Sequence, residues 1–250
     1  MNRVTWNGAT KVAPYFLALL AAAAPCSAQD PDFLFGRPHG TLAIRTGQMR
    51  PRAGSDLFTF VEKQLTVDRK DFNAPTIGFD VDIAVAPFAT VVAGLDFSRS
   101  KTASEYRDFV DNNRLPIQQT TELRETNLTG SIKFDLAPRG REVSQHAWVP
   151  SMVTPYVGVG VGAMHSSFIQ DGDFVDFTDS SVFTHTYSSS SWSPSTHVFG
   201  GVDVKAWKRV YFNGEARYLW SNADLGLDFS GFKPMDLAGF RVTGGIRYMF

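Results

Sequence analysis

Charged side chains alternate with apolar ones in several segments of this sequence, and this alternation is its clearest chemical signal. In the stretch from Thr76 to Ala86, Asp80 and Asp82 are each flanked on both sides by apolar residues. Charges placed in this way must be paired if their face of the segment is buried. The residues at such positions are Arg45, Asp80, Asp82, Asp96, Lys133, Asp135, Asp203, Lys205, Glu215, Arg217, Arg241 and Arg247. Basic and acidic members balance, which predicts a salt-bridge network that fills an interior and argues against an ion-selective channel.

Serine and histidine offer the only candidates for nucleophilic catalysis. His165 is followed by Ser166 and Ser167, and His185 and His197 lie near other serines. A nucleophile needs a base within hydrogen-bond reach and a third group that orients the base, and no spacing here implies such a triad. Neighbours of this kind arise by chance in a serine-rich chain. We therefore expect no enzyme, no catalytic residues and no cofactor, with a lipid-modifying hydrolase as a less favoured alternative.

The segment from Asp171 to Asp179 gathers four carboxylates, which could hold a divalent cation among phosphate groups of a ligand. It lacks the regular ligand spacing of a dedicated calcium loop. The favoured interpretation is a solvated acidic loop, and we expect no metal site.

Another segment, Ser55 to Thr66, has Phe58, Val61 and Leu65 at helical spacing after a capping-type Ser55. It could form a short helix over the mouth of a larger structure, as a lid or partner site. A loop that packs its own apolar residues is the favoured alternative.

The amino-terminal residues have the organisation of a secretory signal peptide. Arg3 and Lys11 precede an apolar run from Val12 to Ala24, and small residues around Ala28 offer a cleavage point. The run is about 13 residues, short of the roughly 20 that a membrane-spanning helix needs. We expect residues 1–28 to be removed, together with Cys26, the only cysteine, and residues 29–250 to form one domain. A lipoprotein that uses Cys26 fits the sequence poorly.

The elements that must position the charges are strands with a period of two. They lie around Leu42 to Arg45, Thr76 to Ala86, Val91 to Ser98, Leu128 to Leu136, Val157 to Met164, His197 to Lys205, Phe212 to Tyr218 and Phe240 to Phe250. Short connections at Pro87 and Trp207 alternate with long loops at residues 49–75, 100–120, 168–193 and 221–236. This pattern predicts an all-β fold, an eight-stranded antiparallel up-and-down transmembrane β-barrel. The connection from Ala137 to Pro150 is longer than the turns of such barrels.

Alternation alone does not decide which face is inside. A secreted lipocalin-like barrel would turn Ile77 and Phe79 inward around an apolar ligand. Two features favour the membrane barrel: the apolar faces carry no charge, and aromatic residues gather at strand ends, as interfacial belts require. We predict such belts from Trp148, Trp192, Trp207, Trp220 and Tyr248.

The carboxyl-terminal strand, "GFRVTGGIRYMF", has Ile246, Tyr248 and Phe250 on one face. It resembles the final strand of bacterial outer-membrane barrels, and "TPYVGVGVG" and "VYFNGEARYLW" resemble strands of the small OmpW and OmpA types. This resemblance implies recognition by the barrel-assembly machinery after passage through the secretion translocon, and a monomer in contact with outer-membrane lipid and lipopolysaccharide. It implies either a narrow conduit for small solutes or an inert anchor whose loops meet partners. The nearly balanced charge gives no reason to expect nucleic acid as a partner.

Overall fold

Eight antiparallel strands form a closed ring in the computed structural model, which describes residues 33–111, 113–179 and 181–250. The predicted signal peptide lies outside these residues. The strands of the ring are β2 (Gly40–Pro51), β3 (Ala74–Ala86), β4 (Ala89–Val110), β5 (Pro116–Asp135), β8 (Val153–Val175), β9 (Val182–Lys205), β10 (Val210–Ala223) and β12 (Gly239–Met249). Each pairs with its neighbours along the chain, and β12 pairs with β2 to close the ring. The predicted up-and-down barrel is therefore confirmed.

The barrel turns its apolar face outward. Ile77 and Phe79 on β3 are 44% and 42% exposed, whereas Asp80 and Asp82 on the same strand are 3% and 1% exposed. The lipocalin-like alternative, which places Ile77 and Phe79 inside, is therefore wrong. None of the described residues forms a helix with the length and apolar character needed to cross a membrane.

Four strands run far beyond the others at one end of the barrel. Strands β4, β5, β8 and β9 are 22, 20, 23 and 24 residues long, against 11 to 14 for the rest of the ring. Residues 100–120 and 168–193, predicted as loops, are therefore mostly strand. Their outward residues change from apolar to Ser, Thr and charged types, so the hydrophobic alternation disappears although the β structure continues.

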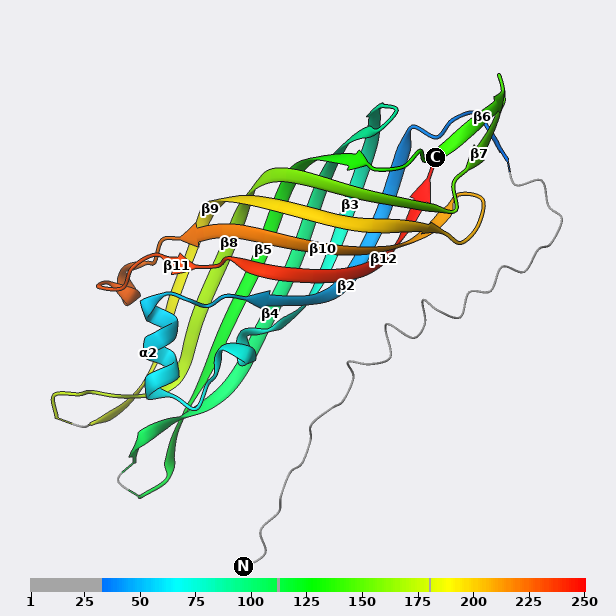
Figure 1. Cartoon of the computed structure of the whole chain (residues 1–250). Helices are drawn as coiled ribbons and strands as arrows, with labels where there is room; N and C mark the ends of the chain where they lie inside the picture. The colour runs from blue at the N-terminus through cyan, green and yellow to red at the C-terminus, as the bar shows by residue number, and fades with distance from the viewer. Residues whose placement is uncertain (1–32, 112, 180) are drawn as a thin grey trace, which may run out of the picture. The chain divides into compact units, whose positions relative to one another are not determined.

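The same end, here called the loop end, carries α2 (Asp56–Gln64), η1 (Arg69–Phe72), η2 (Leu227–Phe229) and β11 (Met235–Asp236). Figure 1 shows α2 at the end of the barrel away from the carboxyl terminus. The α2 segment forms the helix that was the less favoured interpretation of its sequence, and the helix begins after Ser55, but the Ser55 side chain makes no capping hydrogen bond. Instead, Asp56 accepts hydrogen bonds from the Leu57 and Lys233 backbone N–H groups and so ties the helix to a second loop.

The opposite end, here called the turn end, has tight turns at Pro87 and Trp207 and a small second sheet. Strands β6 (Gly140–Ser144) and β7 (Ala147–Pro150) form a hairpin, and β7 also pairs with β1 (Leu34–Phe35). Figure 1 shows this hairpin beside the carboxyl terminus. The unusual length of the Ala137 to Pro150 connection is thus explained, because it forms a sheet that pairs with the start of the described chain.

Phe250 completes the closure of the ring. Its backbone N–H donates to the Gly40 carbonyl, and its own carbonyl accepts hydrogen bonds from the N–H groups of Gly40 and His39. The phenyl ring lies so close to Gly40 that a Cβ atom there would be 2.5 Å from it. A larger residue at position 40 would therefore have to displace the Phe250 ring from the place where the first and last strands meet.

Candidate functional site

Arg45 is the centre of an ion-pair network inside the barrel. Its guanidinium contacts Asp80 on β3, Asp96 on β4 and Glu215 on β10, with N–O distances of 2.6, 3.1 and 3.2 Å. All four side chains are at most 2% exposed. One arginine thus joins carboxylates from three other strands, which is the arrangement that buried charges require.

A second arginine, Arg247 on β12, organises the half of the network nearer the turn end. It lies 2.6 Å from Asp82 and 3.1 Å from Asp203, and Asp82 also accepts a hydrogen bond of 2.7 Å from Lys133. The ring of Tyr156 lies under both cations, 5.0 Å from Lys133 Nζ and 5.4 Å from the Arg247 guanidinium carbon.

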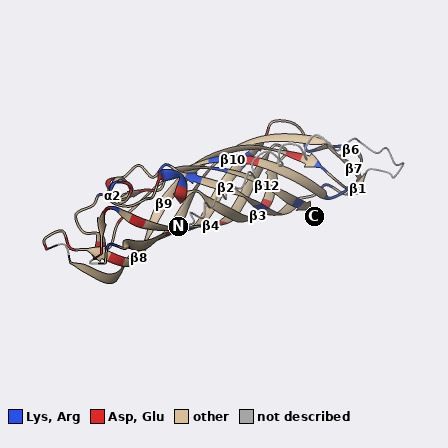
Figure 2. Cartoon of the chain, turned by 90° about the horizontal axis from the view of Figure 1, so that it is seen from below, with Lys and Arg blue, Asp and Glu red and all other residues tan. Residues whose placement is uncertain are grey.

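Toward the loop end, Arg217 and Arg241 continue the network. Arg217 contacts Asp96 at 3.2 Å and Glu215 at 2.9 Å, and Arg241 contacts Glu125 at 2.9 Å. Figure 2 shows basic and acidic residues following one another along the strands. The interior is therefore crossed by a chain of paired charges that come from every strand of the ring except β8: β9 contributes Asp203, and β8 contributes the ring of Tyr156.

All of the predicted interior charges are buried except Lys205, which is half-buried at the end of β9 beside the turn. Asp135 is buried and pairs with Arg139 at 2.5 Å. Sequence reasoning missed Glu125 and Arg139. Glu125 could have been found, because it continues the alternation of Lys133 and Asp135 along β5 toward the loop end; Arg139 lies in the turn beyond the strand, where no alternation applies.

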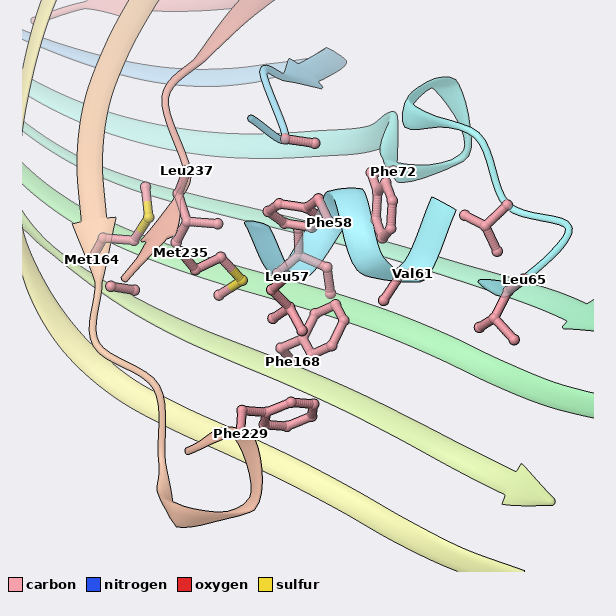
Figure 3. Packing of buried hydrophobic residues seen from close by; sticks show 14 of the residues in the cluster. Leu57, Phe58, Val61, Leu65, Phe72, Met164, Phe168, Phe229, Met235 and Leu237 are labelled. Atoms are coloured by element: carbon pink, nitrogen blue, oxygen red, sulfur yellow. The ribbon is translucent and has the colours of Figure 1, made fainter. Parts of the chain in front are cut away.

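An apolar layer lies directly above the charges, at the loop end. Along β10, Glu215 and Arg217 are followed on the inner face by Leu219, which belongs to a cluster of buried apolar side chains. Phe58 of α2 lies at its centre, with ring centroids 4.9 Å from Phe72 and 6.0 Å from Phe168 (Figure 3). The remaining members come from four loop-end segments and the inner wall: Ala53, Leu57, Val61, Leu65, Val67, Leu123, Met164, Ala223, Phe229, Met235 and Leu237.

This cluster bears on the two interpretations of the Ser55 to Thr66 segment. The favoured loop is wrong, because the segment forms a helix, and the apolar residues of this helix pack over the mouth of the barrel, where the other interpretation placed them. The interior is therefore filled in two layers, one charged and one apolar.

Most predicted belt residues point outward at strand ends. Trp192, Trp207, Trp220 and Tyr248 are exposed on the outer face, and so are Ile246 and Phe250 of the proposed assembly signal. Trp148 is only 5% exposed and lies in the small sheet, against Gly140. The prediction that Trp148 belongs to a lipid-facing belt is therefore wrong, because the connection that carries it folds on itself.

The histidines considered for catalysis do not form a triad. His165 Nε2 lies 2.9 Å from Ser190 Oγ on the outer wall, and His197 Nε2 lies 2.9 Å from Ser131 Oγ inside the barrel. The ring of His185 packs on Tyr187 near the loop end. Within the described ranges, no carboxylate is hydrogen-bonded to any of these three rings, so the third group of a catalytic triad does not accompany any of them.

The acidic segment from Asp171 to Asp179 forms the end of the β8–β9 hairpin. Asp173 accepts a hydrogen bond from Thr184 across the hairpin, while Asp176 and Asp179 accept backbone N–H groups in the turn. The carboxylates are thus spread along the hairpin and oriented by local bonds. Across the part of the chain that the structure describes, no three His, Cys, Asp or Glu residues are grouped so that they could hold a metal ion.

No protein-family model matches the sequence, and no curated protein matches it. Among solved structures, Neisserial surface protein A is 12% identical over 88% of this chain and 97% of that chain, with a TM-score of 0.49. Ail of Yersinia pestis is 13% identical over 85% and 100%, with a TM-score of 0.47. OprG of Pseudomonas aeruginosa is 14% identical over 87% and 99%, with a TM-score of 0.46. The closed ring of eight antiparallel strands, the apolar outer face and the charged interior show that this chain has the fold of an eight-stranded transmembrane β-barrel.

Proposed function

We propose that the protein is a closed outer-membrane anchor that presents structured hairpins outside the cell. The observation that carries this proposal is the interior filled in two layers. Arg45, Lys133 and Arg247 are each 1% exposed, and Leu57 and Phe58 above them are 1% and 0% exposed. A solute that followed the barrel axis would have to separate buried ion pairs and displace the apolar cluster, both of which are energetically expensive.

The conduit for small solutes is the competing function. It requires a path for the solute, either along the barrel axis or out through the barrel wall. The buried ion pairs oppose passage along the axis. Planar-bilayer recording of the refolded mature chain separates the two functions. We expect a silent bilayer, with an open porin reconstituted in the same lipid as the positive control. Reproducible unitary conductance steps from the wild-type chain would contradict the anchor proposal.

We also propose that the loop end faces outward and the turn end faces the periplasm, since barrels of this type have short periplasmic turns and long external loops. Phe177, in the β8–β9 hairpin, is 58% exposed, and Phe88, in a turn-end connection, is 49% exposed. Chymotrypsin added to intact cells should therefore cleave at Phe177 and spare Phe88 until the outer membrane is permeabilised. Cleavage at Phe88 in intact cells would reverse the orientation.

The hairpins beyond the ring are the surface that the anchor presents. The β4–β5 and β8–β9 hairpins carry exposed apolar side chains near their ends, among them Val110, Leu115, Phe177 and Phe183. Because these apolar side chains are exposed near the ends of the hairpins, they support a contact with another surface or protein at these positions. Cells that carry a chain with both hairpins shortened to the level of the ring should lose any surface binding that the wild-type chain confers.

A further inference from the structure

The outer wall carries a basic cluster at the sharp boundary between its apolar band and the polar hairpins. On β4 the outward residues change from Phe97 to Arg99 and Lys101, and on β5 they change from Leu128 through Thr126 to Arg124. Arg99 and Arg124 are direct cross-strand partners. Like charges at such positions repel each other, so this pair is unfavourable for the sheet alone.

Glu122 holds the two arginines together. It accepts hydrogen bonds from Arg99 Nε at 2.6 Å and Arg99 Nη2 at 3.1 Å, and it also contacts Arg124 Nε. Its side chain is only 8% exposed, whereas those of Arg99 and Arg124 are 56% and 52% exposed. Each guanidinium has five N–H donors, so both arginines keep donors that point away from Glu122. Lys101 lies in register with Glu122 and leaves the cluster with an excess of positive charge.

A groove of about 420 Å³ begins at these arginines and crosses the outer wall from β2 to β5. Its apolar surface comes from Pro75, Ile77 and Phe97, while Thr46 and Thr126 lie at its sides. Glu125 also lines it, but that carboxylate belongs to the interior, where it is bound by Arg241. An apolar groove with guanidinium groups at one end matches an amphiphile with a phosphate group and an acyl chain.

We infer that this groove binds a phosphorylated glycolipid of the outer leaflet, the lipid anchor of lipopolysaccharide. Its phosphate lies against Arg99 and Arg124, with Lys101 nearby, and one of its acyl chains lies along Ile77 and Phe97. Glu122 fixes the distance between the two guanidinium groups before the lipid binds. The position of the cluster favours this lipid over a soluble anion. The cluster lies where the apolar band ends on the proposed external side, and lipid phosphates lie at this level.

Native mass spectrometry of the refolded chain with diphosphoryl lipid A tests this inference. The variant Arg99→Gln/Arg124→Gln should retain at least tenfold less lipid than the wild type. The matched control, Arg114→Gln/Arg141→Gln, removes the same charge at a hairpin tip and in the small turn-end sheet, and it should retain lipid as the wild type does. Phe97→Ala should also weaken retention, whereas Phe134→Ala, at the other end of the outward face of β5, should not. Folding of each variant is checked by its electrophoretic shift on heating.

Two further arms identify the chemistry that is recognised. The wild-type chain should retain dephosphorylated lipid as weakly as the Arg99→Gln/Arg124→Gln variant retains lipid A. Inorganic phosphate should not displace lipid A from the wild-type chain. Equal retention of lipid A by the two double variants would overturn the inference. Displacement by inorganic phosphate alone would reduce the site to a simple anion site and would overturn the assignment to a lipid.

Discussion

Arg45 on β2 and Asp80 on β3 form a bidentate ion pair inside the barrel, with N–O distances of 2.6 and 2.8 Å. Arg45 also contacts Asp96 and Glu215, so a single side chain neutralises parts of three carboxylates. Removing Arg45 would leave Asp80 with only the more distant Arg247, at 3.9 Å, and would take one of the cations from Asp96 and Glu215, which keep Arg217.

Arg45→Gln should therefore destabilise the barrel by about 3–5 kcal/mol, the range for removal of one partner from a buried ion pair. Urea unfolding of the refolded chain in detergent or lipid, followed by tryptophan fluorescence, measures the change. The control is Arg50→Gln on the outer face of the same strand, which is expected to change stability by less than about 0.5 kcal/mol. Equal effects of the two substitutions would show that the network contributes little.

The apolar layer yields a second prediction, on α2. Phe58 is buried against Phe72 and Phe168, whereas Phe60 on the same helix is 39% exposed. Phe58→Ala should reduce the unfolding free energy by about 3–5 kcal/mol, as large-to-small changes in cores do. Phe60→Ala should have a clearly smaller effect. Both variants should leave the bilayer without conductance, because the charged layer beneath α2 is intact. Conductance by the Phe58→Ala chain would show that α2, and not the charged layer, closes the barrel.

The membrane-embedded part of the fold was predictable because the solvent imposes a strict rule there. Because lipid lies outside and packed charges lie inside, alternate residues such as Asp80 and Val81 belong to opposite chemical classes. The strands and the residues on their inner faces can be predicted from this alternation. Beyond the apolar band the outer face of the sheet no longer contacts lipid, and this rule no longer applies. On β4 the outward residues that follow Phe97 are Arg99 and Lys101, and the inner ones are Ser98 and Ser100, so the sequence resembles a loop where the structure continues as strand.

Tertiary contacts decided the features that local patterns could not. The sequence around Trp148 is typical of a belt residue, but the hairpin of β6 and β7 buries this side chain. Strand β7 also pairs with β1, which lies more than a hundred residues earlier in the chain. Similarly, Glu122 stands among outward residues of β5, and only the register with β4 shows that it lies between two arginines. Sequence alternation gives the face of a residue, but not its neighbours across the sheet.

Two glycines on neighbouring strands provide a third prediction. A Cβ atom at Gly201 on β9 would lie 2.4 Å from the Gly214 carbonyl oxygen and 2.6 Å from the Tyr156 hydroxyl, whereas a Cβ atom at Gly214 on β10 would meet nothing within 4 Å. Gly201→Ala should thus displace Tyr156, whose hydroxyl donates to Glu215 at 3.1 Å. We expect a lower thermal unfolding midpoint for Gly201→Ala and little change for Gly214→Ala, measured by circular dichroism. A Gly201→Ala chain as stable as Gly214→Ala would mean that the interior has room to adjust.

The last prediction concerns the pH dependence of the cluster on the outer wall, beyond the apolar band. Hydrogen bonds from Arg124 and Arg99 lower the pKa of Glu122 from 4.5 to about 2. A carboxylate whose pKa is lower in the folded state binds its proton more readily when the chain unfolds. Its contribution to stability is therefore complete above the unfolded pKa and is lost as the pH falls toward the folded pKa.

The difference in unfolding free energy between the wild type and Glu122→Gln should consequently be constant from about pH 6 to pH 8 and shrink steadily below about pH 4.5. Urea unfolding at a series of pH values measures this difference. In the background of Arg99→Gln/Arg124→Gln the shift of the Glu122 pKa should disappear, and with it the pH-dependent part of the difference, because the donors that cause the shift are gone. A difference that keeps the same pH dependence without the two arginines would show that another part of the fold sets the ionisation of Glu122.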